Sequence, residues 1–233
     1  MSNLIHFKFF TAFGWIGLFV FIQSCATGPR VEENRPEELY SYACRSHAKV
    51  KKVEGSVWMS VKSREASGQF PAQVLAKSPS FLELEVTNLL GGTEARIYVQ
   101  KSKIKVQVPG KPDQNKKGAW GGIPLQWAPQ LFIGQVPCPS RKKIKKSQMR
   151  VDERHDLLIE FEEAQEQFEY QFKTVAGKPW PEKVIWKKTV NDQSIEVVFE
   201  FSDPESQTRL SKRWEVRSRL GEIKLRWKQR RVE

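Results

Sequence analysis

The stretch LELEVTNLLGGTEARIYV, from Leu82 to Val99, decides the fold class of this chain. On both sides of its centre, apolar side chains recur at every second position, as they do on the buried face of a β-strand. These positions are Leu82, Leu84 and Val86 before the centre, and Ala95, Ile97 and Val99 after it. Gly91 and Gly92 suit a tight turn between the two strands. The sequence therefore predicts a β-hairpin, but its tip carries Leu89 and Leu90 where polar residues are usual.

The same alternation continues on either side of this hairpin. The segments SVWMSVKS and KIKVQVP place apolar residues on one face at Val57, Met59, Val61, Ile104, Val106 and Val108. Later segments with this period are DLLIEFEE, QFEYQFKT, EKVIWKKT, SIEVVFEF, KRWEVRS and EIKLRWKQ, and Gly221 suits a tight turn between the last two. The segment QFPAQVLAKS contains Pro71, which predicts a sheet edge or a bulge. Strands of this kind form an antiparallel sheet with one apolar face.

Two segments have helical rather than strand character. In the first, residues 34–53, Pro36 suits a first helical turn and apolar residues follow at helical spacing, so we expect an N-terminal helix that Gly55 ends. The second, Trp120–Pro139, is strongly apolar and is broken by prolines. Because the apolar face of the sheet must be covered, we expect one or two short helices here as a lid. The predicted fold class is mainly β (α+β).

The chain begins with a segment that predicts export. Lys8 precedes an apolar run from Phe9 to Ile22, which is long enough for the core of a signal peptide and too short to span a bilayer comfortably. The run ends in IQSC, which resembles the lipobox of bacterial lipoproteins and implies cleavage before Cys25 and acylation of that residue, including palmitate. The alternative is an ordinary signal peptide that happens to contain a cysteine. Ala26 follows, and the absence of aspartate there favours the outer membrane.

The expected organisation is therefore a signal peptide over residues 1–24, a lipidated flexible tether over residues 25–38 and one domain over residues 39–233. The tether is rich in proline and charge, as linkers often are. A chain of 233 residues is long enough for one such domain and a leader.

The chain carries 39 Lys and Arg against 27 Asp and Glu, a formal charge of +12. In an exported protein this excess predicts a solvated surface with some attraction to anionic head groups, and no nucleic-acid partner. The densest run, Arg141–Lys146, is either a loop kept soluble by charge or a dedicated lipid site.

The sequence contains no recognisable catalytic or metal motif. Its two histidines beyond the leader, His47 and His155, lie in no spacing that holds a metal or pairs a nucleophile with a base. Cys44 and His47 lie three residues apart on one predicted helix, which is a weak hint of a metal site. Cys44 and Cys138 either form a disulfide or are two separate buried residues. We expect no enzymatic activity, no metal and no cofactor.

The hairpin tip also carries a family resemblance. LEVTNLLGGTEARI closely resembles the strand, loop and strand of the LolB family, outer-membrane receptors that accept lipoproteins from the periplasmic carrier LolA. The shared core is T-N-x-L-G-x-T-E, met here at Thr87, Asn88, Leu90, Gly91, Thr93 and Glu94. GGIPLQWAPQLFIGQVP resembles the lid of that family, and the resemblance as a whole covers roughly residues 45–203. Here Leu89 replaces the usual proline, the lid before Ile123 is shorter and more basic, and a final hairpin, Arg213–Lys228, extends past the pattern.

The resemblance implies a curved, incomplete antiparallel half-barrel with an N-terminal helix and a short helical lid over an apolar cavity for acyl chains. Candidate cavity-lining residues are Val57, Met59, Val61, Leu82, Leu84, Val86, Ile97, Val99, Ile104 and Val106. Candidate lid residues are Ile123, Leu125, Trp127, Leu131 and Phe132. The leucine that inserts cargo into the membrane falls on Leu90, with Leu89 as an addition of this sequence.

The implied function is that of a monomeric chaperone of lipoprotein localisation. Anchored in the outer membrane and facing the periplasm, it accepts acylated lipoprotein cargo from a LolA-type carrier and inserts that cargo. The residues alone do not separate a cavity from a filled core, since inward apolar residues on strands usually pack. The main alternative is a structural or adaptor lipoprotein that uses its outer strands to bind another envelope protein. An unrecognised hydrolase is a remote third.

Overall fold

The computed structural model describes residues 35–45, 50–64, 67–101, 103–117, 119–120, 123–139 and 141–233. The predicted signal peptide, the acylation site Cys25 and His47 lie outside these residues. The first described helix, α1, begins at Pro36, so the last residues assigned to the tether are helical.

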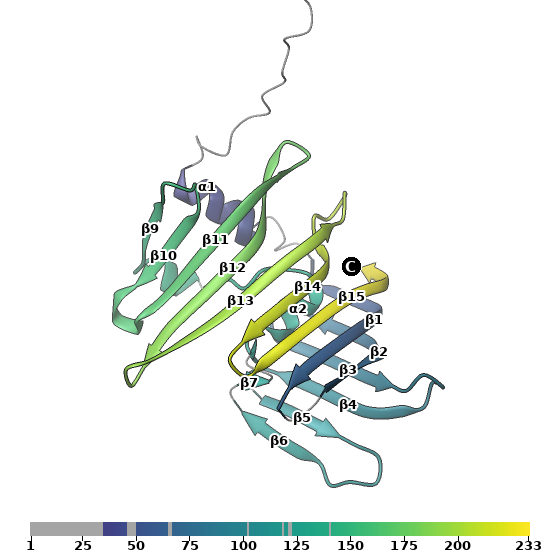
Figure 1. Cartoon of the computed structure of the whole chain (residues 1–233). Coiled ribbons are helices and arrows are strands. Elements are labelled where there is room, and N and C mark those ends of the chain that lie inside the picture. The colour runs from purple at the N-terminus through teal and green to yellow at the C-terminus, as the bar shows by residue number, and fades with distance from the viewer. Residues whose placement is uncertain are drawn as a thin grey trace, which may run out of the picture. The chain divides into compact units, whose positions relative to one another are not determined.

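The main feature of the described chain is one curved antiparallel sheet, which is not closed into a barrel (Figure 1). Its thirteen described strands lie side by side in the order β6 (Gln114–Lys117), β5 (Lys103–Gln107), β4 (Thr93–Gln100), β3 (Phe81–Thr87), β2 (Ser67–Lys77), β1 (Lys52–Ser63), β15 (Gly221–Val232), β14 (Ser211–Ser218), β13 (Gln193–Pro204), β12 (Lys178–Val190), β11 (Glu166–Val175), β10 (Leu157–Phe161) and β9 (Gln148–Val151). A two-stranded sheet pairs β7 (Ala119–Trp120) with β8 (Ile123–Pro124).

Short helices accompany the sheet. They are α1 (Pro36–Tyr40), the π-helical turn η2 (Ser41–Arg45), α2 (Ala128–Ile133), α3 (Arg141–Ile144) and the 3₁₀ turn η3 (Glu162–Ala164). Helix α2 packs on β1, β2 and β3, while α1 packs on β9 and β10, and η2 packs on β12. The predicted lid is thus present as α2, which ends at Gly134 in a left-handed conformation.

The two ends of the domain meet in the middle of the sheet. Strand β15 pairs with β1, so that Val53 faces Val232 and Ser63 faces Gly221. The C-terminal hairpin β14–β15 therefore joins the two halves of the sheet and lies far from either edge (Figure 1).

The alternation in the sequence predicted the inner face correctly. Of the six hairpin positions, all but Ala95 are buried, and Ala95 packs against the core from a partly buried position. The inward residues of the C-terminal hairpin, Ile223, Leu225 and Trp227, are also buried.

The predicted N-terminal helix was too long. Val53, which we placed in the helix, lies in β1, and Gly55 is also part of that strand. A Cβ at Gly55 would clash with the carbonyl oxygen of Gln229 on β15, and the residue has a φ of +144°. The glycine is therefore required by the close approach of two strands, and it does not end a helix.

The prediction of a sheet edge at Pro71 holds only locally, because β2 as a whole lies between β1 and β3. Pro71 pairs with Trp58 on β1, but the pairing of β2 with β3 stops at Ala72 and Val86, one residue short of Pro71. The Pro71 carbonyl faces that side and accepts a long hydrogen bond from the Thr87 hydroxyl at 3.5 Å. Proline is tolerated here because the pairing with β3 has already ended at the position where Pro71 would have had to donate a backbone N–H.

Candidate functional site

The tip between β3 and β4 is held in shape by Asn88. Its side-chain Oδ1 accepts hydrogen bonds from the backbone N–H groups of Leu90, at 3.0 Å, and Gly92, at 2.8 Å. The backbone N–H of Asn88 donates to the Gly92 carbonyl, and the backbone carbonyl of Asn88 accepts from the Gly91 N–H. Gly91 has a φ of +87°, which an L side chain rarely adopts. Asn88 and the glycines of the motif therefore build a defined turn.

This turn projects two leucines into solvent. Leu89 is 81% exposed and Leu90 is 97% exposed, and neither contributes a side chain to the described core. The turn geometry needs Asn88 and the glycines but does not need leucine at either position. Two adjacent, fully solvated leucines on an ordered tip thus serve no packing purpose in this structure.

The base of the tip is fastened by polar contacts on the outer face. The Thr93 hydroxyl donates to Glu85 Oε1 at 2.6 Å, and Arg96 Nη2 donates to the same oxygen at 3.1 Å. The hydrogen bond from Thr93, followed by that from Arg96, holds the pKa of Glu85 below its ordinary value. Thr93 of the shared motif therefore has a structural role at the foot of the hairpin.

Five of the ten candidate cavity-lining residues border no open space in this structure. Val57, Met59, Leu82, Leu84 and Val99 are 0% exposed, so no water-sized volume lies against them. Val61, Val86, Ile97 and Ile104 retain only 3–9% exposure, and Val106 is partly buried. The described interior is therefore packed, as in an ordinary core.

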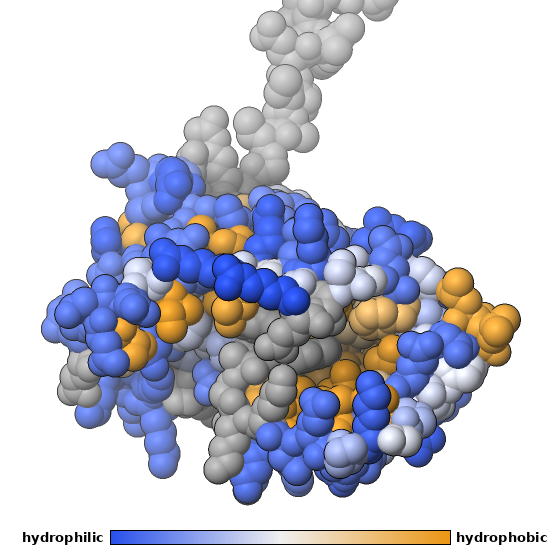
Figure 2. Space-filling model, turned by 60° about the horizontal axis from the view of Figure 1, so that its bottom comes forward, coloured by the Kyte–Doolittle hydropathy of each residue, from blue (hydrophilic) through white to orange (hydrophobic). Residues whose placement is uncertain are grey.

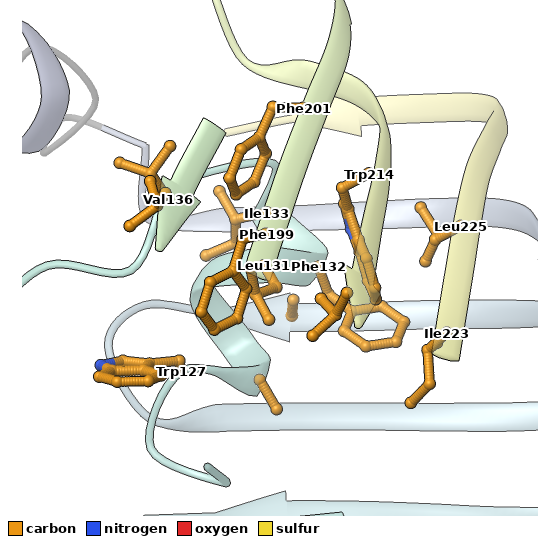
Figure 3. Close-up of a cluster of buried hydrophobic side chains, with 14 of the residues drawn as sticks. Trp127, Leu131, Phe132, Ile133, Val136, Phe199, Phe201, Trp214, Ile223 and Leu225 are labelled. Carbon is orange, nitrogen blue, oxygen red and sulfur yellow. The ribbon is translucent and has the colours of Figure 1, made fainter. Parts of the chain in front are cut away.

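Helix α2 supplies much of that packing. Leu131, Phe132 and Ile133 are 0% exposed, and the Phe132 ring meets Trp214 of β14 edge to face (Figure 3). Leu125 and Trp127, just before the helix, are buried as well. Of the lid candidates, only the side chain of Ile123 lies outside the described structure.

Trp127 joins the lid to the opposite half of the sheet. Its ring packs edge to face against Trp186 on β12, at 4.9 Å between centroids, and against Phe168 on β11 and Phe199 on β13. Helix α2 itself packs on β1, β2 and β3. The lid segment therefore contacts both halves of the sheet from within its curve.

A pocket of about 400 Å³ opens beside the lid. It is lined by Tyr40, Cys44, Arg45, Gln126, Trp127, Gln130, Cys138, Pro139, Lys143, Glu166 and Phe168. Its lining combines the aromatic residues Tyr40, Trp127 and Phe168 with the charged residues Arg45, Lys143 and Glu166. The Oε1 atom of Gln130 is buried without a hydrogen-bond partner among the described residues.

The C-terminal end of α2 is fixed by Arg230, whose side chain is only 2% exposed. Its Nη1 donates to the carbonyls of Ser211, at 2.7 Å, and Ile133, at 3.4 Å, and its Nη2 donates to the carbonyl of Leu210. Nη2 also lies 3.0 Å from Glu205 Oε1. Burial lowers the pKa of Arg230, while Glu205 opposes that shift. The buried charge is thus compensated by one carboxylate and three carbonyls.

Gly134 allows this close approach. It has a φ of +94°, and a Cβ there would lie 2.5 Å from the Ser211 carbonyl oxygen and 2.9 Å from Arg230 Nη1. The Ser211 N–H donates to the Gly134 carbonyl at 3.1 Å. A larger residue would push α2 away from β14 and from the arginine.

A disulfide joins Cys44 of η2 to Cys138, which follows α2. This settles the alternatives for the two cysteines, and it leaves Cys44 no thiol for a metal site. Among the described residues, no group of three histidine, cysteine, aspartate or glutamate side chains is arranged to hold a metal ion. His155 lies in the turn between β9 and β10.

The basic run Arg141–Lys146, for which a soluble loop and a lipid site were the alternatives, begins with helix α3. Lys143 Nζ lies 2.7 Å from Glu166 Oε2, and the other oxygen of Glu166 accepts a hydrogen bond from Trp186 Nε1. Lys143 therefore has a structural partner, while Lys142 and Lys145 are exposed.

This architecture is similar to that of several solved structures. A LolA superfamily protein from Nitrosomonas europaea aligns with a TM-score of 0.52 at 9% identity, over 86% of this chain and 94% of that one. The chain has a LolA-like fold. A DUF1329 family protein from Desulfovibrio piger aligns with a TM-score of 0.56, also at 9% identity and with the same coverage. At this identity the likeness establishes the fold alone.

No protein-family model matches the sequence of this LolA-like chain, and no curated protein matches it either. None of its described helices is long and apolar enough to cross a membrane.

Sequence reasoning located the tip leucines and the lid but missed Arg230 and Glu205. In sequence Arg230 resembles its neighbour Arg231, which is exposed. The inward positions of β15 run from Ile223 through Leu225 to Trp227, and strict alternation would next turn Gln229 inward. A bulge at Lys228 shifts this phase and places Arg230 inside.

Proposed function

We propose that this protein is an outer-membrane lipoprotein that receives acylated lipoproteins from a LolA-type periplasmic carrier and inserts them into the membrane. The observation that carries the proposal is the ordered tip with Leu89 and Leu90 at 81% and 97% exposure. The LolA-like fold and the T-N-x-L-G-x-T-E motif support it. In this proposal Cys25 carries the lipid anchor, residues 25–38 include the tether, and the protein acts as a monomer without catalysis or cofactor.

The energetics of the tip favour contact with lipid. Transfer of a leucine side chain from water to an apolar medium is worth roughly 1.5–3 kcal/mol. Both leucines are already solvated, so entry into a bilayer costs no packing elsewhere in the protein. The tip is held by Asn88, so its ordering is also largely achieved before contact.

The cargo must displace part of the packed interior. Because Val57 and Met59 on β1 and Leu82 and Leu84 on β3 are fully buried, the proposal has α2 move away from β1, β2 and β3 when an acyl chain enters. In this movement the C-terminal end of α2, held at Gly134 and by Arg230, stays in place while the rest of the helix moves. In this proposal Leu125, Trp127, Leu131 and Phe132 leave the interior when cargo enters.

The test separates cargo binding from cargo delivery. With a carrier loaded with an acylated lipoprotein, Leu90→Glu should still receive the cargo, because the tip lies outside the core. Its delivery to liposomes should fall about tenfold or more, since one buried leucine is lost and a charge must be desolvated.

A matched control adds the same charge elsewhere. Ala176→Glu changes an exposed residue in the turn between β11 and β12. This variant should deliver cargo like the unmodified protein. Undiminished delivery by Leu90→Glu, or equal losses in both variants, would contradict the proposal.

One observation favours the adaptor alternative. An adaptor needs no cavity, and the described interior is filled by α2 and the inward side chains of the strands. Such a protein would bind an envelope partner through its outer face and would not distinguish acylated from non-acylated polypeptides.

A further inference from the structure

The exposed large apolar side chains of the described chain are unevenly distributed. They are Leu89, Leu90, Val190, Ile195 and Leu220. All five lie at the same end of the strands, as the strand pairing shows.

The pairing fixes which turns share this end. Ser63, at the end of β1, faces Gly221 at the start of β15, and Gly221 also faces Ser218 at the end of β14. Ser218 faces Val197, near the start of β13, whose turn to β12 contains the pair Val190 and Gln193. The end of β1 and the turns β12–β13 and β14–β15 are therefore neighbours along one end of the sheet.

The β3–β4 tip belongs to the same end. Strand β3 runs parallel to β1, two strands away, and Thr87 at its end contacts Pro71 on β2. We call this end, with the end of β1 and the turns β3–β4, β12–β13 and β14–β15, the tip rim. Among the described residues, the opposite end of the strands carries no exposed large apolar side chain.

Leu220 resembles the tip leucines in its setting. It is 63% exposed in the β14–β15 turn, and its N–H donates to the Ser218 hydroxyl at 3.1 Å. A Cβ at the next residue, Gly221, would lie 2.5 Å from the Lys62 carbonyl oxygen, so the turn sits tightly against the end of β1. Leu220 is thus a third leucine presented to solvent, on a second turn of fixed shape.

Val190 and Ile195 extend the apolar inner face outward. Ile195 continues the inward series of Val197, Phe199 and Phe201 on β13. Val190 likewise follows Trp186 on β12 at the inward spacing. Both residues are about two-fifths exposed, at 42% and 43%, because they lie beyond the core. Figure 2, in which the bottom of Figure 1 is turned toward the viewer, shows a hollow with apolar surface.

Basic side chains stand beside these apolar residues. Arg219 precedes Leu220, and Lys62 and Arg64 lie at the end of β1; all three are exposed and form no ion pair with another described residue. Leucine next to unpaired arginine and lysine fits the interface of a bilayer, where the leucine meets the acyl chains and the basic side chains meet anionic head groups.

We propose that the tip rim is a membrane-docking surface and that Leu220, with Arg219, is its second contact after the Leu89–Leu90 tip. The occupant is a phospholipid bilayer that contains anionic lipids. The two hairpins are four strand spacings apart, roughly 20 Å along the sheet, so both can meet one bilayer. This inference rests on the proposed function for the contact between the Leu89–Leu90 tip and the membrane. It adds that the whole tip rim faces the membrane.

The experiment places a fluorescent label at single sites of the full chain. Leu220→Cys, Leu90→Cys and Ala176→Cys are each labelled with an environment-sensitive dye, with the native disulfide left oxidised. The proteins are reconstituted in vesicles of phosphatidylethanolamine and phosphatidylglycerol, with and without lipids that carry a quencher in their acyl chains. Labels at 220 and 90 should shift to shorter wavelength and lose fluorescence to the quencher. The label at 176, on the opposite end, should do neither.

Each other outcome has a definite meaning. A label at 220 that behaves like the one at 176, while the label at 90 is quenched, overturns the inference and leaves the proposed function intact. If only the label at 220 is quenched, the docking surface stands and the tip of the proposed function is contradicted. If neither is quenched, both are contradicted. Leu220→Glu provides a second readout: its delivery of cargo should fall, whereas delivery equal to that of the unmodified protein counts against the second contact.

Discussion

Arg230 and Arg231 are neighbours in the chain with opposite surroundings. The Arg230 side chain is 2% exposed and is bound to Glu205 and three carbonyls, whereas the Arg231 side chain is 75% exposed and pairs with Glu54 at 3.2 Å. A buried cation with several partners contributes far more to structure than a solvated surface pair.

Replacing Arg230 by methionine should therefore destabilise the protein by about 3–5 kcal/mol, because Glu205 and the carbonyls lose their common donor. The matched change Arg231→Met should cost less than about 1 kcal/mol. Urea unfolding of both variants measures the difference. Equal and small losses would show that Arg230 does not fasten α2.

Glu205 makes this region sensitive to acid. Burial alone would raise its pKa, but hydrogen bonds from Thr208 and Arg230 outweigh burial and hold the pKa below the ordinary value of 4.5. A carboxyl whose pKa is lower in the folded state contributes stability above its unfolded pKa, and this contribution is lost as the pH falls. The free energy of unfolding should thus fall as the pH drops through 4.5 and below.

The variant Glu205→Gln isolates this contribution. It should be less stable than the unmodified protein at neutral pH, and the gap should narrow as the pH falls through 4.5. The measurement is urea unfolding of both proteins across this range. A gap that stays constant with pH would contradict the assigned protonation behaviour.

Single residues were predictable from sequence where a local pattern determined them. Leu89 and Leu90 broke the expected polarity of a turn, and the structure shows them exposed. Arg230 was not predictable, because its burial depends on a bulge between β15 and β1, two paired strands that lie far apart in the sequence. Nothing in the local sequence marks that bulge.

At the scale of elements, the disulfide connects the N-terminal helical segment to the lid. Cys44 lies in η2 and Cys138 lies after α2, with 94 residues between them in sequence. A cross-link that closes so long a loop restricts the unfolded chain strongly. It also keeps η2 and the end of the lid segment together if α2 moves.

Reduction of the disulfide should lower the free energy of unfolding by about 2–5 kcal/mol. The check is urea unfolding with and without dithiothreitol. The double variant Cys44→Ser and Cys138→Ser should unfold like the reduced protein and should not respond to the reductant. Full stability in the reduced protein would show that packing alone holds these segments.

Elements were predicted well where the residue period was clear and poorly where it was not. The strands with alternating residues and the lid helix were recovered. The N-terminal helix was extended too far because Val53 fits both a helix and a strand, and tertiary pairing with β2 and β15 decided for the strand. The short strands β6 and β9 carry too few inward apolar residues to show a period.

At the scale of the whole molecule, the pairing of β1 with β15 closes the two halves into one curved sheet. The sequence showed neighbouring hairpins, but a contact between the first and last strands is non-local and has no short-range signal. The C-terminal hairpin therefore looked like an addition and is in fact the centre of the sheet.

The packed interior determines how the whole protein can bind an acyl chain. In the described structure α2 fills the curve of the sheet, so an acyl chain and α2 compete for the same space. If the protein handles lipidated cargo, binding must depend on the acyl chains; if it is an adaptor, binding must depend on the polypeptide.

The most direct test is therefore a binding measurement with one peptide in two forms. A triacylated lipoprotein peptide and the same peptide without acyl chains are titrated against the full chain, and binding is followed by calorimetry and native mass spectrometry. Our account predicts a one-to-one complex with the acylated peptide and none with the bare peptide. Equal binding of both forms, or no binding of either, would contradict it.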